Sequence, residues 1–172
     1  FIKNNFLANF RNINYEAKNV DKFKDETTSE LFGSLGLLSK IDFFKKRGNL
    51  NHQFTPKTLI KFSPGSMRKE TSGSRLDPVN AFELNRLSEI NNFETGNTAT
   101  LGFDYTTKEN NTKKFNFSVA QVISEKENKK FDSKTSLDEK LSDLTGSLEY
   151  NIKDNYKLTS DFSIDQNYNE IN

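Results

Sequence analysis

The pattern that decides the fold runs from Asp143 to Asp165 and reads DLTGSLEYNIKDNYKLTSDFSID. Apolar and polar residues alternate along it with a period of two, which is typical of β-strands that bury one face. Leu144, Leu148 and Tyr150 share one face, and the polar residues between them share the other. At the centre, Asp154-Asn155 is a pair that tolerates left-handed backbone and predicts a tight turn. The stretch is therefore predicted to be an antiparallel hairpin.

The same alternation recurs through most of the chain. It predicts about seven strands, near residues 6–10, 31–43, 51–62, 98–106, 115–124, 144–153 and 156–164, and an eighth beginning near Tyr168. Pro56 must lie at a sheet edge, a bulge or a strand end, because proline has no N–H to donate. Short connections (48–49, 107–113 and 154–155) alternate with long ones (19–29, 63–95 and 125–142). Short turns on one side and long loops on the other are typical of outer-membrane barrels.

The composition restricts the class of protein. A hydrophobic fraction of 33% is low for a soluble globule, yet the 16 Phe and 5 Tyr argue against disorder. Barrel strands that alternate lipid-facing and lumen-facing residues reconcile the two observations. The formal net charge of +1 gives no indication of nucleic acid, and the absence of Cys excludes disulfides within the chain.

A soluble β-sandwich or lipocalin-like barrel would show the same alternation. Two details favour a membrane barrel. The strands reach roughly 10 residues, the length that a tilted membrane-spanning strand needs. Aromatic residues also gather at strand ends, where interfacial girdles lie, namely Phe43, Phe44, Tyr105, Phe115, Tyr150 and Tyr156.

The stretch from Pro56 to Gly96 carries spaced motifs. It includes Asn80-Ala-Phe82-Glu-Leu-Asn85-Arg86 and Glu94-Thr-Gly96, followed by Gly102-Phe-Asp-Tyr105 and later Ser142-Asp-Leu-Thr-Gly146. In this order and spacing, the pieces resemble the central barrel region of LptD, the LPS-assembly family also called the organic solvent tolerance protein. The resemblance covers residues 56 to about 165. Glu89 stands where the family often has Gly, and Asn91-Asn92 stand where it often has Asp-Arg.

The resemblance implies an all-β fold, an antiparallel up-and-down transmembrane β-barrel segment that contributes about 7–8 strands to a larger barrel. Residues 1–172 would be part of one barrel domain with a long loop at 63–95, and would form an open curved sheet in isolation. The implied function is transport of lipopolysaccharide (LPS) to the outer leaflet of the Gram-negative outer membrane. The implied partners are LPS, membrane lipid, the plug lipoprotein LptE and the periplasmic bridge protein LptA.

Two groups of candidate site residues follow. The motif loop supplies residues that would hold the loop in place or contact LPS: Arg75, Asn80, Phe82, Asn85, Arg86, Glu94 and Gly96. The polar strand face supplies residues that would line the lumen: Thr98, Thr100, Asp104, Asn116, Ser118, Glu149, Asn151 and Asp161. The loop cations Arg68, Lys69, Arg75 and Arg86 are expected to pair with Asp77, Glu83 and Glu94, and we hypothesise an ion pair between Arg86 and Glu94.

Two alternatives compete with LPS transport. Another outer-membrane barrel, such as a porin or substrate receptor, would share the hairpins but not the motif from Asn80 to Gly96. An outer-membrane phospholipase would need a base beside a nucleophile, and the only His, His52, stands beside no nucleophile motif. The sequence therefore predicts a protein that is not an enzyme. It also predicts no cofactor and no metal site.

Overall fold

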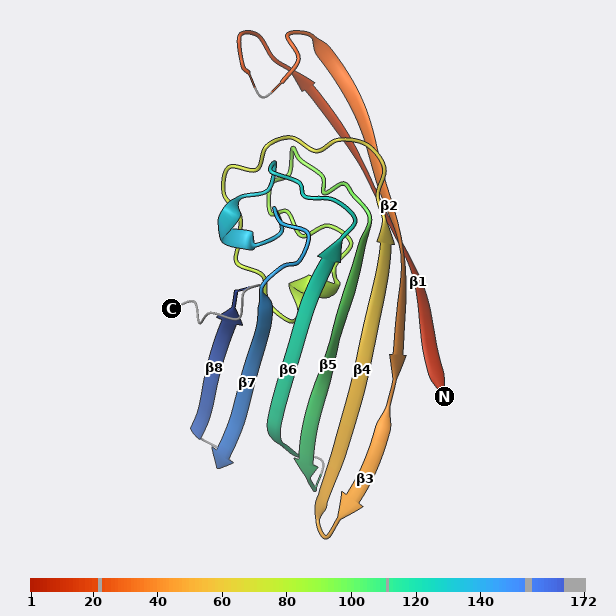
Figure 1. Cartoon of the computed structure of the whole chain (residues 1–172), viewed down its shortest axis with the longest axis vertical. Coiled ribbons are helices and arrows are strands. Elements are labelled where there is room, and N and C mark those ends of the chain that lie inside the picture. Colours follow the sequence, from red (N-terminus) through yellow and green to blue (C-terminus); the bar gives the residue numbers. More distant parts are fainter. Residues whose placement is uncertain (22, 111, 154–155, 166–172) are drawn as a thin grey trace.

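The computed structural model describes residues 1–21, 23–110, 112–153 and 156–165, and these form one antiparallel, open sheet (Figure 1). The strands are β1 (Ile2–Glu16), β2 (Thr27–Ile41), β3 (Phe43–Arg47), β4 (Leu50–Phe62), β5 (Thr98–Glu109), β6 (Thr112–Ser124), β7 (Leu144–Lys153) and β8 (Tyr156–Ile164). Their order is β1-β2-β4-β5-β6-β7-β8, and β3 also pairs with β4. Two 3₁₀ turns, η1 (Asn80–Phe82) and η2 (Ser133–Thr135), lie in the long connections. No helix in the described part of the chain is long and apolar enough to cross a membrane.

Pro56 accounts for the division between β2 and β3. Both strands pair with β4 in one continuous register, and the gap at Asp42 lies opposite Thr55 and Pro56. A proline cannot donate the N–H that a ladder needs at this point. Asp42 instead accepts a 2.7 Å hydrogen bond from the Thr55 hydroxyl and pairs with Lys3 of β1 at 2.6 Å. The single strand expected over residues 31–43 is therefore interrupted, but its direction is kept.

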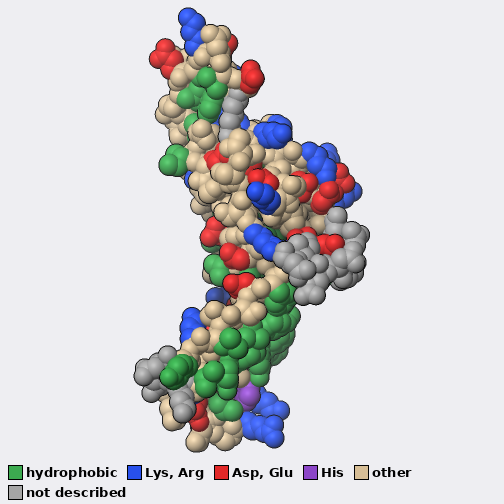
Figure 2. Space-filling model, turned by 90° about the vertical axis from the view of Figure 1, so that its left-hand side faces the viewer, with side chains coloured by type: hydrophobic (Ala, Val, Ile, Leu, Met, Phe, Trp, Pro, Cys, Tyr) green, Lys and Arg blue, Asp and Glu red, His purple; other side chains and the backbone are tan. Residues whose placement is uncertain are grey.

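The two faces of the sheet differ in character. The outer face, as we call it, presents exposed apolar side chains on nearly every strand: Ile2, Phe6, Phe10, Leu31, Leu35, Phe43, Phe54, Ile60, Phe62, Leu101, Ile123, Tyr150 and Leu158. Register places several of these residues opposite one another across neighbouring strands, as in Leu35–Phe62 and Phe43–Phe54. Figure 2 shows apolar side chains gathered over the half of the molecule that lies away from the long loops. Such a continuous apolar surface is what the lipid-facing side of a barrel wall presents.

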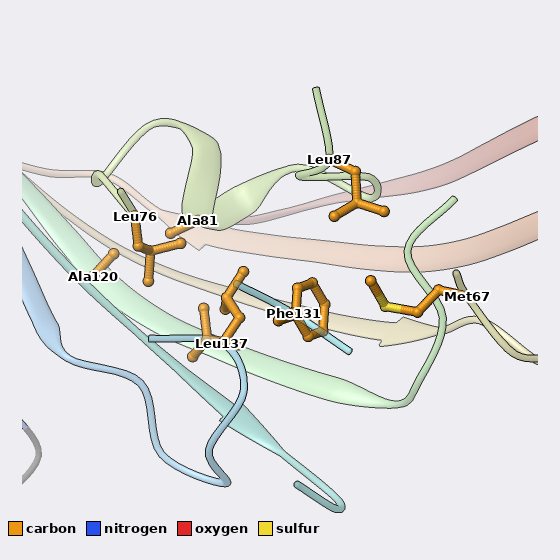
Figure 3. Close-up of a cluster of buried hydrophobic side chains, with 8 residues drawn as sticks. Met67, Leu76, Ala81, Leu87, Ala120, Phe131 and Leu137 are labelled. Carbon is orange, nitrogen blue, oxygen red and sulfur yellow. The ribbon is translucent and has the colours of Figure 1, made fainter. Parts of the chain in front are cut away.

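The inner face, on the opposite side of the sheet, is partly covered by the two long connections, residues 63–97 and 125–143 (Figure 1). These connections form a hydrophobic core with the inner face of β6, in which Met67, Leu76 and Leu87 from the first meet Phe131 and Leu137 from the second (Figure 3). Ala120 and Val122 of β6 form the floor of this core and are fully buried. The connections are thus ordered by packing against the sheet.

One predicted connection differs in the structure. The turn expected over residues 107–113 is shorter, because β5 continues to Glu109 and β6 begins at Thr112. Asn110 adopts the left-handed backbone (φ 47°) that such a tight turn requires. The turn expected at Asp154-Asn155 and the strand expected to begin at Tyr168 lie outside the described residues.

Candidate functional site

A buried cluster of three charges joins the first long connection to the sheet. Lys61 projects from the inner face of β4, while Arg86 and Glu94 come from the connection. Glu94 Oε1 binds both Lys61 Nζ and Arg86 Nη2, and its Oε2 accepts hydrogen bonds of 2.9 Å from Arg86 Nε and from the Arg86 backbone N–H. All three side chains are almost completely buried. The expected Arg86–Glu94 ion pair is therefore present, with Lys61 as a third member.

The electrostatics of the cluster are set by competing effects on Glu94. Burial raises the pKa of the Glu94 carboxyl, but Arg86 and Lys61 outweigh it and hold that pKa well below its usual range. Asn85 supports the arrangement, because its side-chain oxygen accepts a 2.8 Å hydrogen bond from the Glu94 N–H. Gly96 then reverses the chain at φ 115°, a conformation that favours glycine, and its N–H donates to Ser63 at 2.7 Å. Asn85, Arg86, Glu94 and Gly96 thus form one local scaffold.

The other motif residues lie nearby, but they contact η1 and β4 and not the charge cluster. Asp77 accepts the backbone N–H groups of Val79 and Asn80, and the Asn80 side chain accepts the Asp77 N–H at 2.9 Å. This network fixes the start of η1. Phe82, at its end, has Lys57 Nζ of β4 4.4 Å from its ring centroid. Arg75 contributes its backbone carbonyl, which accepts a 3.3 Å hydrogen bond from Asn80.

The expected pairing of the other loop cations is wrong. Arg68 pairs with Glu30 of β2, a residue distant in sequence, and its guanidinium lies 5.0 Å and 4.9 Å from the ring centroids of Tyr15 and Phe23. Asp77 is occupied by backbone N–H groups instead of a cation. Within the described ranges, Lys69 and Arg75 have no ion pair. Long-range strand pairing, which brings Glu30 beside the loop, decides these partners.

The structure places every residue that was expected to line the lumen on the inner face. Thr100 is fully buried and donates to the Ala81 carbonyl at 3.0 Å, which anchors η1. Asp104 pairs with Lys57 at 2.9 Å, and Glu149 pairs with Lys157 at 2.9 Å. Ser118 is buried, at 8% exposure. The remaining members of this set are only partly covered or are exposed: Thr98, Asn116, Asn151 and Asp161.

A cavity of about 480 Å³ lies on the inner face below η1, and we call it the polar basin. Strands β2, β4, β5 and β6, with Asp42 after β2, provide its polar lining: Lys40, Asp42, Gln53, Thr55, Lys57, Asp104, Thr106, Lys108, Lys113, Asn116 and Ser118. Pro78, Val79 and Phe82 close it from the loop side. Four lysines face two aspartates here, so the basin is cationic and rich in hydrogen-bonding groups. Such a surface suits a hydrated ligand that carries hydroxyl and anionic groups.

A comparison with protein-family models now adds to this geometry. The model described as LptD, LPS transport system D, matches residues 5–172, which is almost the whole chain. The chain belongs to the LptD family. A search of the curated proteins finds no match.

Membership of the LptD family gives the function and the location. LptD proteins transport and assemble LPS at the outer membrane of Gram-negative bacteria, and they are transporters and not enzymes. The predicted fold class is confirmed as an open antiparallel sheet consistent with part of a barrel. His52, the residue considered for catalysis, has its Nδ1 2.8 Å from the Tyr105 hydroxyl. This hydrogen bond between two strands is a structural contact.

Sequence reasoning missed two residues that complete the LptD scaffold. Lys61 reads as an ordinary polar position of β4, and nothing in the sequence distinguishes it from the other polar residues of that strand. Asn92, which stands where the family often has a charged residue, is fully buried. Its side chain accepts the Arg68 N–H at 2.9 Å and donates to the Arg68 carbonyl at 3.0 Å. A neutral amide therefore satisfies both backbone groups of Arg68.

Proposed function

We propose that this sheet is a wall segment of the LptD barrel and that the saccharide portion of LPS passes along its inner face through the polar basin. The observation that carries the proposal is the contrast between the two faces. The outer face is apolar and exposed, whereas the inner face gathers four lysines and several amide and hydroxyl groups in one cavity. LPS has the same division, since its acyl chains are apolar and its sugars carry hydroxyl and phosphate groups.

The long connections have a complementary role in this proposal. The Lys61–Glu94–Arg86 cluster fixes residues 63–97 against β4, above the basin. The connections then act as a fixed partial closure of the lumen at the loop end of the strands. Their motif residues serve mainly as scaffold, because their polar groups are directed at one another and at the sheet. The basin is left as an inner-face surface that is open to substrate.

The proposed partners follow from family membership and from the surface that remains uncovered. LptA would deliver LPS from the periplasm, and LptE would occupy the lumen. The inner face of β8 is exposed at Lys157, Thr159 and Asp161, so we assign LptE to this part of the wall. A photoreactive amino acid in place of Asp161 should capture LptE in cells. The same amino acid in place of Leu158, on the outer face, should not.

The basin can be tested by charge neutralisation in proteoliposomes that contain the full protein. Lys40→Gln, Lys108→Gln and Lys113→Gln together should slow the arrival of LPS at the outer leaflet several-fold, because contacts with LPS phosphates are lost. A control triple variant of exposed lysines outside the basin, Lys18→Gln, Lys24→Gln and Lys126→Gln, should transport normally. Equal rates for the two triple variants would contradict the role of the basin.

A further inference from the structure

The outer face carries two basic side chains at the end where the turns are short. β3 consists of Phe43-Phe-Lys-Lys-Arg47, and the chain then turns at Gly48-Asn49 into β4. Register places Lys45 opposite His52 and Arg47 opposite Leu50, so both cations share the outer face with Phe43 and Phe54. Lys46, between them, lies on the inner side. The apolar face therefore ends in exposed positive charge.

These cations border a shallow cavity of about 340 Å³ whose walls are mostly aromatic. Phe43 and Phe54 form a pair with ring centroids 6.4 Å apart, and Tyr105 closes the far side, held by its hydrogen bond to His52. Lys45 and Arg47 are both exposed, and neither forms an ion pair with any residue that the structure describes. Lys114, another cation near the short turns, is paired with Glu109 at 3.7 Å. Figure 2 shows basic side chains beside the histidine where the apolar area ends.

The depth of these two cations in the membrane indicates what they contact. Short turns of outer-membrane barrels lie on the periplasmic side, so this end of the sheet is level with the headgroups of the inner leaflet. A charge on the lipid-facing side is costly at the bilayer centre but nearly free at the interface, where aromatic girdles also lie. A basic group near a membrane surface is attracted to anionic lipid by about 1 kcal/mol. Arg and Lys both bind phosphate, and the aromatic walls suit the first carbons of an acyl chain.

We propose that Lys45 and Arg47, with the aromatic cavity of Phe43, Phe54 and Tyr105, form a binding site for an anionic phospholipid headgroup of the inner leaflet. The two cations contact the headgroup phosphate, and the aromatic side chains contact the glycerol and upper acyl carbons. The site is separate from the polar basin, which lies on the opposite face. It depends on the outer face meeting lipid and does not depend on the route that LPS takes.

The test uses the full protein in lipid bilayers doped with phosphatidylglycerol that carries a photoreactive group near its headgroup. Adducts are mapped by mass spectrometry, and we expect them on residues 43–54. Lys45→Gln and Arg47→Gln should each lower the adduct yield about fivefold, the factor that corresponds to one surface charge. Lys46→Gln, the matched control on the other face, should leave the yield unchanged. Exchanging the two cations, Lys45→Arg with Arg47→Lys, should retain it.

Folding of each variant is checked by the heat-dependent shift in gel mobility that folded barrels show, so that a loss of yield is scored on folded protein only. An analogous phosphatidylcholine probe should give fewer adducts at this site than phosphatidylglycerol. The proposal is overturned if Lys45→Gln and Lys46→Gln behave alike, or if both lipid probes react equally. Displacement of the lipid by millimolar inorganic phosphate would also overturn it, because the site would then bind a free anion.

Discussion

Glu94 is the residue on which the attachment of the first long connection depends. Its partners come from two elements, since Lys61 is part of β4 and Arg86 is part of the connection. The motif spacing was sufficient to predict the Arg86–Glu94 pair, because both residues belong to one stretch of chain. Lys61 could not be predicted, since its place beside Glu94 follows from the tertiary packing of the loop on the sheet. Asn92 was missed, and Arg68 was expected to have other partners, for the same reason.

Removing the charge of Glu94 should destabilise the protein strongly. Glu94→Gln leaves two buried cations without their counter-charge, and breaking a buried ion pair in this way costs about 3–5 kcal/mol. The free energy of unfolding, measured by urea titration of the full protein in detergent, should fall by that amount. Glu127→Gln, an exposed control, should change it by less than about 0.5 kcal/mol. A loss in Glu94→Gln no larger than in this control would contradict the scaffold role.

The charge swap between Arg86 and Glu94 should rescue only part of the damage. Arg86→Glu combined with Glu94→Arg restores the pair but leaves the new guanidinium beside Lys61. The double variant should therefore be more stable than either single reversal and less stable than the wild type. Full rescue in the same urea titration would mean that Lys61 is not coupled to Glu94.

Acid should weaken the same cluster. The pKa of the Glu94 carboxyl is depressed in the folded state. Its contribution to the free energy of unfolding is therefore fully present above its unfolded pKa of 4.5, and it is lost as the pH falls from 4.5 toward the lower folded-state pKa. Urea titrations from neutral pH downward should show the free energy of unfolding decreasing through this window. Glu94→Gln should show a smaller slope, because the titrating group is gone. Identical slopes in the two proteins would indicate that other carboxyls dominate.

At the scale of elements, strand alternation was the most informative signal in the sequence. It correctly assigned which side chains of β5 to β8 share a face, because a period of two is a local property of extended chain. The lengths of β5 and β6 were underestimated at their turn, since polar residues near Asn110 read as loop although they continue the ladder. The sequence predicted residues that hold the first long connection in place. It did not predict the core that both connections share, because this core is assembled from residues far apart in the sequence.

A charge on the outer face should be tolerated according to its depth along β5. Phe103→Lys, near the middle of the strand, should cost about 2–4 kcal/mol in a bilayer, whereas Thr107→Lys, near the turn, should cost about 0–1 kcal/mol. The fraction folded into lipid vesicles over a urea series measures both variants. Similar costs at the two positions would mean that this face does not contact a membrane core.

Truncating Phe131 should loosen the second long connection. Phe131→Ala removes a large side chain from the core between the connections, and such a cavity costs about 3–5 kcal/mol. Hydrogen exchange should become faster at residues 125–143, while β5 stays protected by its ladders. Unchanged exchange in the connection would show that this core does not hold it.

At the scale of the whole molecule, the sheet separates a lipid-facing surface from a polar surface on which both connections and the basin lie. The family motifs predicted the biological role, and the alternation predicted the two faces. The basin itself could not be predicted, because its lysines come from β2, β4, β5 and β6 and meet only through strand register. On our proposal, the saccharide portion of LPS contacts the polar surface of this wall, and not its outer face, as it crosses.

The most direct measurement is a scan of β5 with a photoreactive amino acid, one position at a time from Phe103 to Lys108, in cells that are actively exporting LPS. We predict LPS adducts with a period of two, at the basin-lining positions Asp104, Thr106 and Lys108, and their loss when the supply of LPS from the periplasm is blocked. Adducts concentrated at Phe103 and Tyr105, or none at the inner positions, would contradict passage of LPS along this face.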